Sequence, residues 1–285
     1  MYTTLISVSQ LQQLSAQAQP LMVFDCSFEL MRPEAGDAQY QESHIAGAVR
    51  ADLDRHLSAK GAADAASGGR HPLPSLDAFA AWLGHVGFGP DMQAVVYDRQ
   101  GVNYCGRLWW MLKWAGHEAV AVLDGGLQAW VAAGGAVESG TSPTPPSGTF
   151  NPGSPRAVLA STDTVSSRLG RPIQTLVDAR GTPRFRGEVE PLDPVAGHIP
   201  GALNRPFTDN FGPDGRFKSA PQLRAEFDAL LGGRDPASVV HHCGSGVSAV
   251  PNIIAMEIAG LGRAALYAGS WSAWCSDPSR PFAKG

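Results

Sequence analysis

Short apolar runs alternate with amphipathic stretches along the whole chain. The apolar runs, each of a length typical of buried strands, are residues 21–24, 94–97, 119–123, 174–177 and 238–241. Stretches with the period of a helix lie at residues 76–83, 221–231 and 250–259. Ser75 precedes the first of these stretches as an expected N-cap. This alternation predicts an α/β fold, in which a parallel sheet has helices on both faces and ligands bind at the carboxyl ends of the strands.

A change of composition divides the chain near its middle. Residues 134–155 are dominated by Gly, Pro, Ser and Thr, which favour neither a helix nor a central strand. The total length of 285 residues suits two domains of ordinary size. We therefore predict a first domain at residues 1–134, a linker at 135–156 and a second domain at 157–285.

The two halves repeat each other's motifs. The pairs are HIAGA with HIPGA (residues 44–48 and 198–202), VVYD with VVHH (95–98 and 239–242) and GGLQAW with GSWSAW (125–130 and 269–274). The last two pairs are separated by the same number of residues. A period of about one domain indicates an internal duplication rather than a solenoid. We expect the recurring His44 and His198 to be structural and to bond loop backbone.

The bulk properties exclude several classes of function. The net charge is −4 and no basic block occurs, so a nucleic-acid partner is not predicted. The chain starts without a basic and apolar leader and lacks an apolar run of membrane length, so no membrane association is expected. Its four cysteines are far apart and match neither a disulfide framework nor a zinc site. These features predict a cytoplasmic protein without a metal or an organic cofactor.

The segment after the strand at 238–241 carries the main chemical signal. Cys243 lies just beyond this strand, and a Gly-Ser-Gly loop and the start of a helix near Ser248 come after it. Gly244 and Gly246 allow the main chain to approach a ligand closely. A loop of N–H groups at a helix N-terminus attracts negative charge. We therefore predict that Cys243 is a thiolate nucleophile that carries a persulfide in a double displacement.

The cysteines also admit other interpretations. Cys26, Cys105 and Cys275 lack such a loop and are interpreted as structural. A zinc site at His241, His242 and Cys243 is disfavoured because neighbouring strand residues point to opposite faces. A cysteine phosphatase carries an arginine six positions after its cysteine, where this chain has Ala249. A non-enzymatic persulfide carrier or protein-binding module remains the second alternative, and turnover with cyanide distinguishes it from an enzyme.

The motifs HIPGA, CGSGVSA (residues 243–249) and GSWSAW together resemble the tandem-domain rhodaneses over essentially the whole chain. The loop CGSGVSA is similar to that of the 3-mercaptopyruvate sulfurtransferase branch. The resemblance implies two rhodanese-like domains and sulfur transfer from 3-mercaptopyruvate or thiosulfate, through a Cys243 persulfide, to cyanide, a thiol or a protein thiol. By the spacing of the repeat, Arg99 stands where Cys243 stands in the second half. The first domain is therefore expected to be catalytically silent.

The resemblance also implies the residues that bind the donor. Arg184 matches the family's anion-binding arginine, and Arg180 is a weaker candidate for the same role. The loop contributes Gly244, Gly246, Val247 and Ser248. One feature departs from the branch, which has a second arginine shortly after a Glu-Pro pair. Here Glu190-Pro191 is followed by Leu192 and Asp193, which puts a preference for mercaptopyruvate in doubt.

A further set of residues is implied to handle a proton. In the branch, a serine of the cysteine loop is linked to a histidine and an aspartate, and the matching residues are Ser245, His71 and Asp54. A histidine oriented by an aspartate can move a proton between the serine and the substrate. Equally, His71 and Asp54 can serve only to anchor a loop, and the sequence leaves both interpretations open.

Overall fold

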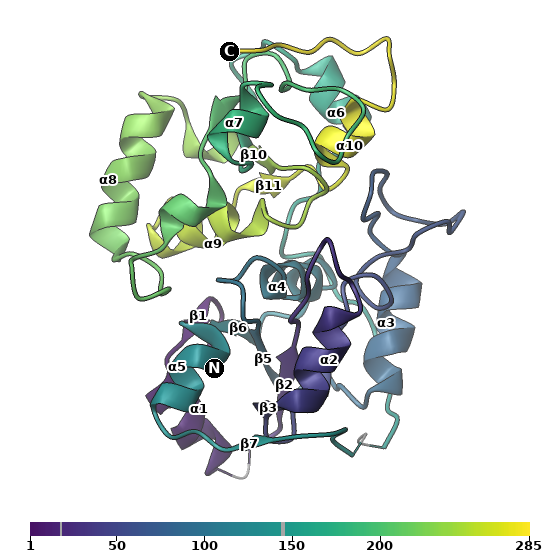
Figure 1. Ribbon diagram of the computed structural model, residues 1–285, viewed down its shortest axis with the longest axis vertical. Helices are drawn as coiled ribbons and strands as arrows, with labels where there is room; N and C mark the ends of the chain where they lie inside the picture. The colour runs from purple at the N-terminus through teal and green to yellow at the C-terminus, as the bar shows by residue number, and fades with distance from the viewer. Residues whose placement is uncertain (18, 144–145) are drawn as a thin grey trace. The chain divides into compact units, whose positions relative to one another are not determined.

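The chain folds into two compact units, each with its own sheet (Figure 1). The structure is a computed structural model that describes residues 1–17, 19–143 and 146–285. Unit 1 comprises Met1–Asp64, Pro74–Arg156 and Pro213–Arg216, and unit 2 comprises Ala65–Leu73, Ala157–Gly212 and Phe217–Gly285. The predicted linker, residues 135–156, is grouped with unit 1, and its residues 144 and 145 lie outside the described residues.

Unit 1 is built on a five-stranded parallel sheet in the order β1-β6-β5-β2-β4. These strands are β1 (Leu5–Ile6), β2 (Leu21–Asp25), β4 (Val49–Arg50), β5 (Gln93–Tyr97) and β6 (Val120–Leu123). A separate antiparallel pair joins β3 (His44–Ile45) to β7 (Val137–Glu138). The helices of the unit are α1 (Val8–Ser15), α2 (Ala35–Glu42), α3 (Leu76–His85), α4 (Cys105–Trp114) and α5 (Gly126–Ala132). As predicted, the Ser75 side chain caps α3 by accepting a hydrogen bond from the N–H of Ala78.

Unit 2 repeats this topology with a four-stranded parallel sheet in the order β11-β10-β8-β9. Its strands are β8 (Thr175–Asp178), β9 (Leu203–Asn204), β10 (Val239–His242) and β11 (Ala265–Leu266). Leu159 pairs with Leu266 in parallel, as β1 pairs with β6 in unit 1. The predicted duplication is therefore visible in the strand order itself.

Helices cover both faces of the sheet in unit 2. They are α6 (Thr162–Ser167), α7 (Thr182–Phe185), α8 (Ala220–Leu231), α9 (Val250–Ile258) and α10 (Ser270–Trp274). Successive strand residues enter different cores, because Val239 and Val177 pack with α8 and α9 while Val240 and Leu176 pack with α6, α7 and α10. The α/β class, with parallel sheets covered on both faces, is confirmed.

The carboxyl ends of β8 and β10 lie side by side. Asp178 is paired with His242 across these parallel strands, and the N–H of Ala179 donates to the carbonyl of His242 at 2.8 Å. The residues after each strand therefore emerge at the same edge of the sheet, where ligands bind in open parallel sheets. Cys243 is the first residue after β10 and Arg180 is the second after β8.

The two recurring histidines have equivalent structural roles. Nδ1 of His44 lies 2.7 Å from the carbonyl of Tyr40, and Nδ1 of His198 lies 2.8 Å from that of Phe185. Each imidazole stacks on the ring of the same residue, with centroids 3.8 Å apart. Both histidines bond main-chain carbonyls, as predicted, but these carbonyls lie in the last turns of α2 and α7 and not in loops.

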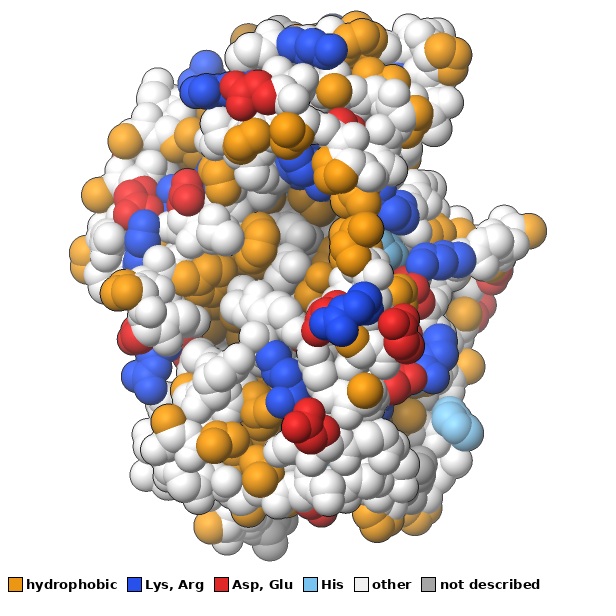
Figure 2. Space-filling view, viewed as in Figure 1, with side chains coloured by type: hydrophobic (Ala, Val, Ile, Leu, Met, Phe, Trp, Pro, Cys, Tyr) orange, Lys and Arg blue, Asp and Glu red, His pale blue; other side chains and the backbone are white. Residues whose placement is uncertain are grey.

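Two further features are the distribution of charge on the face in Figure 2 and the length and polarity of the helices. On the face drawn in Figure 2, acidic and basic side chains are interspersed, and its described atoms form no extended basic surface. No helix in the described part of the chain has both the length and the apolar character needed to cross a bilayer.

Candidate active site

The Cys243 loop joins β10 to α9 and is almost completely buried. Cys243 is 2% exposed and Ser245 is 6% exposed. Gly246 has a φ of +74°, and a Cβ atom there would collide with the carbonyl of Ala268. Helix α9 begins at Val250, the first residue of the predicted helical stretch 250–259. The loop therefore depends on a glycine at 246 for both its conformation and its packing.

The first turn of α10 holds the backbone of the loop. The N–H of Cys243 donates to Oγ of Ser270 at 3.1 Å, and Ser270 Oγ in turn donates to the carbonyl of Tyr267 at 2.9 Å. The N–H groups of Trp271 and Ser272 donate to the carbonyls of Cys243 and Gly244 at 3.0 and 2.9 Å. We did not predict that residues of the GSWSAW motif hold the Cys243 loop, although the motif contained a signal for it.

Ser270 adopts a backbone conformation that residues other than glycine rarely take. Its φ is +54°, in the left-handed region, and its counterpart in unit 1 is Gly126 with a φ of +58°. Serine at this position keeps the strained backbone and adds a hydroxyl that accepts from Cys243. The replacement of a glycine by a serine within a repeated motif was the sequence signal.

Several main-chain N–H groups of the loop lack a protein acceptor. Within the described residues, the N–H groups of Gly244, Ser245, Val247 and Ala249 donate to no protein atom. Buried N–H groups are normally paired, so a run of such donors beside one sulfur atom suits an anion held by the main chain.

The corresponding loop of unit 1 encloses an anion of its own. The carboxylate of Asp98 accepts hydrogen bonds from four main-chain N–H groups, those of Gln100 (2.9 Å), Val102 (3.0 Å), Tyr104 (2.8 Å) and Cys105 (2.9 Å). Burial raises the pKa of Asp98, and these four donors act against that rise. The donors of the unit 1 loop are thus already occupied by a side chain of the same loop.

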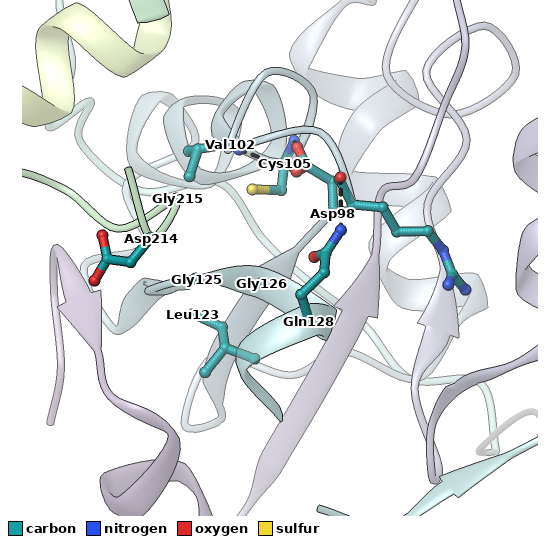
Figure 3. Close-up of a pocket in the computed structure, with 11 residues that line it drawn as sticks. Asp98, Val102, Cys105, Leu123, Gly125, Gly126, Gln128, Asp214 and Gly215 are labelled. Carbon is teal, nitrogen blue, oxygen red and sulfur yellow. Dashed lines mark hydrogen bonds between the residues drawn. The ribbon is translucent and has the colours of Figure 1, made fainter. Parts of the chain in front are cut away.

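A cavity of about 230 Å³ lies beside this loop within unit 1 (Figure 3). Asp98, Val102 and Cys105 line it, and dashed lines in Figure 3 mark bonds to Asp98 from N–H groups of lining residues drawn there. Burial, followed by the charge of Asp98, raises the pKa of Cys105 well above its usual value. Cys105 is therefore a neutral thiol and a poor nucleophile. Arg99, the counterpart of Cys243, donates to the carbonyls of Gln39 and Ser43.

The structure brings His71 and Ser245 together, as the resemblance implied. Nδ1 of His71 lies 2.8 Å from Oγ of Ser245, and the imidazole is 2% exposed. Asp54 belongs to unit 1, where its carboxylate lies 2.7 Å from Nζ of Lys60. Its link to His71 would join the two units and stays a prediction.

The two predicted arginines have different surroundings. Arg180 is 4% exposed, and its guanidinium donates to the carboxylates of Asp178 and Glu190 and to the carbonyl of Gly197. Arg184 has a side chain 21% exposed, and its Nη2 donates to Glu190 at 2.6 Å. Arg180 is thus fully bonded within the unit, which favours a supporting role, whereas Arg184 keeps one nitrogen, Nη1, facing the loop.

A third arginine, Arg70, also lies beside the loop and was not predicted. A Cβ atom placed on Gly244 would lie 3.0 Å from Nη2 of Arg70, 3.6 Å from Nη1 of Arg184 and 3.8 Å from its Nη2. The main-chain N–H of Arg70 donates to Oγ of Ser272 at 3.0 Å. The only sequence signal was its position directly before His71.

His242 is not a cation that activates its neighbour. Its ring is fully buried, and Nδ1 lies 3.9 Å from Oδ2 of Asp178. Burial is the main cause that lowers the pKa of His242, and the charge of Asp178 acts against it. The imidazole is therefore neutral at pH 7.

The comparisons with known proteins find sulfurtransferases among the relatives of this chain. A probable 3-mercaptopyruvate sulfurtransferase of Pseudomonas aeruginosa is 49% identical over 280 residues, with 96% of each chain covered. A putative thiosulfate sulfurtransferase, SseB of Mycobacterium tuberculosis, is 39% identical, covering 99% of this chain and 97% of its own.

A solved structure and a family model extend the comparison. The 3-mercaptopyruvate sulfurtransferase SseA of Escherichia coli matches with a TM-score of 0.80 at 28% identity, covering 95% of this chain and all of its own. The model of the rhodanese-like domain matches twice, at residues 7–133 and 161–277. The chain therefore belongs to the rhodanese family and contains two copies of the rhodanese-like domain.

Proposed function

We propose that this protein is a sulfurtransferase in which Cys243 takes a sulfur atom from a small anionic donor, carries it as a persulfide and passes it to an acceptor. The donor is 3-mercaptopyruvate or thiosulfate, and the acceptor is cyanide, a small thiol or a protein thiol. Relatives that match almost the whole chain bear both donor names.

One observation carries the assignment of the site. The two loops of the duplicated fold differ in how their N–H groups are used. In unit 1 four of them bind the carboxylate of Asp98, whereas in unit 2 those of Gly244 and Ala249 have no protein acceptor among the described residues. A loop of this fold therefore suits an enclosed anion, and in unit 2 the outer sulfur of a Cys243 persulfide supplies it.

The reaction proceeds in two displacements. The Cys243 thiolate attacks the sulfur of mercaptopyruvate, and the carbon–sulfur bond breaks with its electron pair on carbon, giving the enolate of pyruvate. The new persulfide loses the proton that came with the donor thiol, and the enolate carbon takes up one proton. The step therefore gives pyruvate and a persulfide anion with no net gain or loss of protons. With thiosulfate the sulfur–sulfur bond breaks and sulfite leaves with the electron pair. In the second displacement the acceptor attacks the outer sulfur and Cys243 leaves as a thiolate.

The pair formed by His71 and Ser245 is suited to the proton. Their contact of 2.8 Å lies on the residue two positions after the nucleophile. A buried imidazole bonded to a hydroxyl can carry a proton between that hydroxyl and the enolate carbon. Thiosulfate leaves as sulfite without this proton, so the pair matters more for mercaptopyruvate.

Two variants test the nucleophile. Cys243→Ser removes the attacking sulfur and is expected to abolish turnover with both donors, while the thermal unfolding temperature stays close to that of the parent. Cys275→Ser is the matched control, because Cys275 is a half-buried cysteine in the same unit. The measurements are steady-state rates with each donor and the intact mass after donor treatment, in which one added sulfur atom marks the persulfide. Turnover or an added sulfur in Cys243→Ser contradicts the proposal.

A further outcome separates an enzyme from a carrier. If the protein gains one sulfur atom but does not release it to cyanide or a thiol over many cycles, the persulfide chemistry stands and the catalytic assignment does not.

A further inference from the structure

A buried asparagine in the first turn of α9 links the helix that follows the Cys243 loop to a distant segment. Asn252 is the third residue of α9 and is fully buried. Its Nδ2 donates to the carbonyl of Arg205 at 3.0 Å, and its Oδ1 accepts from Nδ2 of Asn210. Both ends of the amide are therefore bonded, and both partners lie in the segment that follows β9.

The partners of Asn252 belong to a larger polar network. Asn210, the last residue of the short 3-10 helix η1 (Phe207–Asn210), is fully buried, and its Oδ1 accepts from Nε of Arg205 at 3.1 Å. Nη2 of Arg205 donates to Glu226 in α8 at 2.8 Å. A buried network whose members are bonded to one another holds a single arrangement. Asn252 therefore ties the first turn of α9 to a fixed point.

The same segment is bonded to the chain that leaves β8. The N–H of Arg205 donates to the carbonyl of Asp178 at 3.0 Å, and the N–H of Phe207 donates to that of Ala179 at 3.0 Å. Asp178 is the last residue of β8, at the edge of the sheet where Cys243 emerges from β10. The network thus fixes the first turn of α9 relative to the edge of the sheet that carries the nucleophile.

The start of α9 also supplies one of the main-chain N–H groups of the Cys243 loop. Ala249 directly precedes the helix, and its N–H donates to no protein atom within the described residues. The N–H of Val250 donates to the carbonyl of Val247 at 3.1 Å, which joins the loop to the first turn. A shift of this turn would therefore redirect the N–H of Ala249, and a hydrogen bond weakens steeply when its donor is misaligned.

Unit 1 has no polar side chain at the corresponding position. By the spacing of the repeat, the residue of α4 that corresponds to Asn252 is Leu108, which is fully buried. A buried leucine leaves no polar group unpaired, whereas a buried amide is tolerated only where it is bonded. The asparagine thus occurs in the unit whose loop has N–H groups without protein acceptors, and not in the unit whose loop binds Asp98.

From this arrangement we propose that Asn252 is a positioning residue, which holds the first turn of α9 so that the N–H of Ala249 faces the sulfur that Cys243 receives. The proposal rests on the proposed function for the identity of that sulfur. Negative charge builds up on the transferred sulfur as its bond to the donor molecule breaks. A well-placed N–H group therefore stabilises the transition state more than the bound donor molecule. The amide of Asn252 is itself bonded at both ends, so it acts through the main chain.

Replacement of the amide tests the proposal in the full chain. Asn252→Leu copies Leu108 of unit 1 and removes both hydrogen bonds. Its kcat with thiosulfate and cyanide is expected to fall about 10-fold or more, while the KM for thiosulfate stays within twofold of the parent, because the loss is confined to the transition state. Thr175→Val is the matched control, since Thr175 is a buried residue of unit 2 whose hydroxyl is bonded to Ser238 at the amino end of β8. Its kinetics should equal those of the parent.

A second measurement reports on the persulfide itself. The protein is equilibrated with fixed mixtures of thiosulfate and sulfite, and the fraction that carries one added sulfur atom is read from the intact mass. Asn252→Leu should lower this loading constant about 10-fold, which is the loss expected for about one hydrogen bond to an anion. Asn210→Ala removes one of the two partners of Asn252 and should give a smaller decrease in the same direction.

Two results overturn the proposal. If kcat and the loading constant of Asn252→Leu lie within twofold of the parent, the network does not influence the sulfur. If Asn252→Leu and Thr175→Val lose equally, the effect belongs to a general loss of rigidity in unit 2. If Asn252→Leu does not fold, Asn210→Ala decides, and a loading constant of that variant equal to the parent's overturns the proposal.

Alkylation of Cys243 distinguishes this proposal from the proposed function. The rate of its reaction with iodoacetamide at neutral pH, located by peptide mass, depends on the same main-chain N–H groups and requires no sulfur transfer. If the protein transfers no sulfur but Asn252→Leu slows this alkylation several-fold, the positioning role at Cys243 stands and the sulfurtransferase assignment fails. If transfer occurs and Asn252→Leu changes neither rate, the positioning role fails alone.

Discussion

The loop after β5 and the loop after β10 are two versions of one structure with opposite uses of their main-chain donors. The first binds its own carboxylate, that of Asp98, through four N–H groups. The second begins with a cysteine and has N–H groups without protein acceptors within the described residues. Both loops follow a central strand of a parallel sheet, so the difference lies in a few side chains and not in the fold. A loop that contains its own anion has no capacity for another, which supports the prediction that the first domain is catalytically silent.

The largest expected effect comes from removing that internal anion. Asp98→Asn keeps the shape of the side chain but turns an amide NH₂ toward N–H donors that need an acceptor. We expect unit 1 to lose about 2–4 kcal/mol of unfolding free energy, while the folded protein retains its transfer rate. Denaturant unfolding measures the loss, and Asp91→Asn, an exposed aspartate of the same unit, is the control. An unchanged midpoint would contradict the role given to Asp98.

A smaller effect is expected at the residue that fixes the active loop. Ser270→Ala removes the acceptor of the Cys243 N–H and keeps the left-handed backbone, for an expected loss of about 1–2 kcal/mol. Ser270→Gly copies Gly126 of unit 1 and relieves the backbone, so it should be more stable than the alanine variant. Both should load sulfur more slowly than the parent, measured by intact mass over time. Equal loading rates in all three proteins would show that the hydroxyl does not position Cys243.

A local change is expected at Gly244. Gly244→Ala places a methyl group 3.0 Å from Nη2 of Arg70 and should raise the donor KM several-fold with little change in stability. The counterpart Gln100 in unit 1 shows that the loop accommodates a side chain there, so Gln100→Gly serves as a control that leaves the kinetics unchanged. An unaltered donor KM in Gly244→Ala would mean that the donor does not bind above this glycine.

The smallest effect concerns pH. Because burial raises the pKa of Asp98, the folded chain holds this proton more tightly than the unfolded chain. The contribution of Asp98 to stability therefore falls as the pH rises from its ordinary pKa through its folded value. Unfolding free energies of the parent and of Asp98→Asn, compared at several pH values from about 4 to 7, isolate this slope. A difference between them that grows with pH would reverse the sign.

Local pattern in the sequence was sufficient to predict the longer strands and the duplication. Apolar runs predicted the strands β2, β5, β6, β8 and β10 to within a residue or two, whereas the two-residue strands of the sheets were not predicted. The repeated motifs predicted the duplication that the strand order shows. The contact between His71 and Ser245 was implied by the family resemblance.

The features that the sequence did not reveal depend on contacts between distant segments. Arg70 reaches the site only because the glycine-rich run before it passes close to the carbonyl of Gly269, and no local periodicity encodes that path. Asp98 stands where unit 2 has His242. Its four hydrogen bonds form only when the loop folds around its carboxylate. The bond from Cys243 to Ser270 likewise joins residues that local pattern cannot connect.

The anion that the unit 1 loop binds, the carboxylate of Asp98, is part of the chain and is therefore always present. Its loop gains nothing from the substrate, so the melting of this half should be indifferent to whether the enzyme is charged with sulfur. By the proposed function, unit 2 acquires its anion only when Cys243 carries the persulfide, and an anion bound to the native state alone raises thermal stability. Loading with sulfur should therefore raise the unfolding temperature of unit 2 and leave that of unit 1 unchanged. Unit 1 then provides an internal reference against which the change in unit 2 is measured.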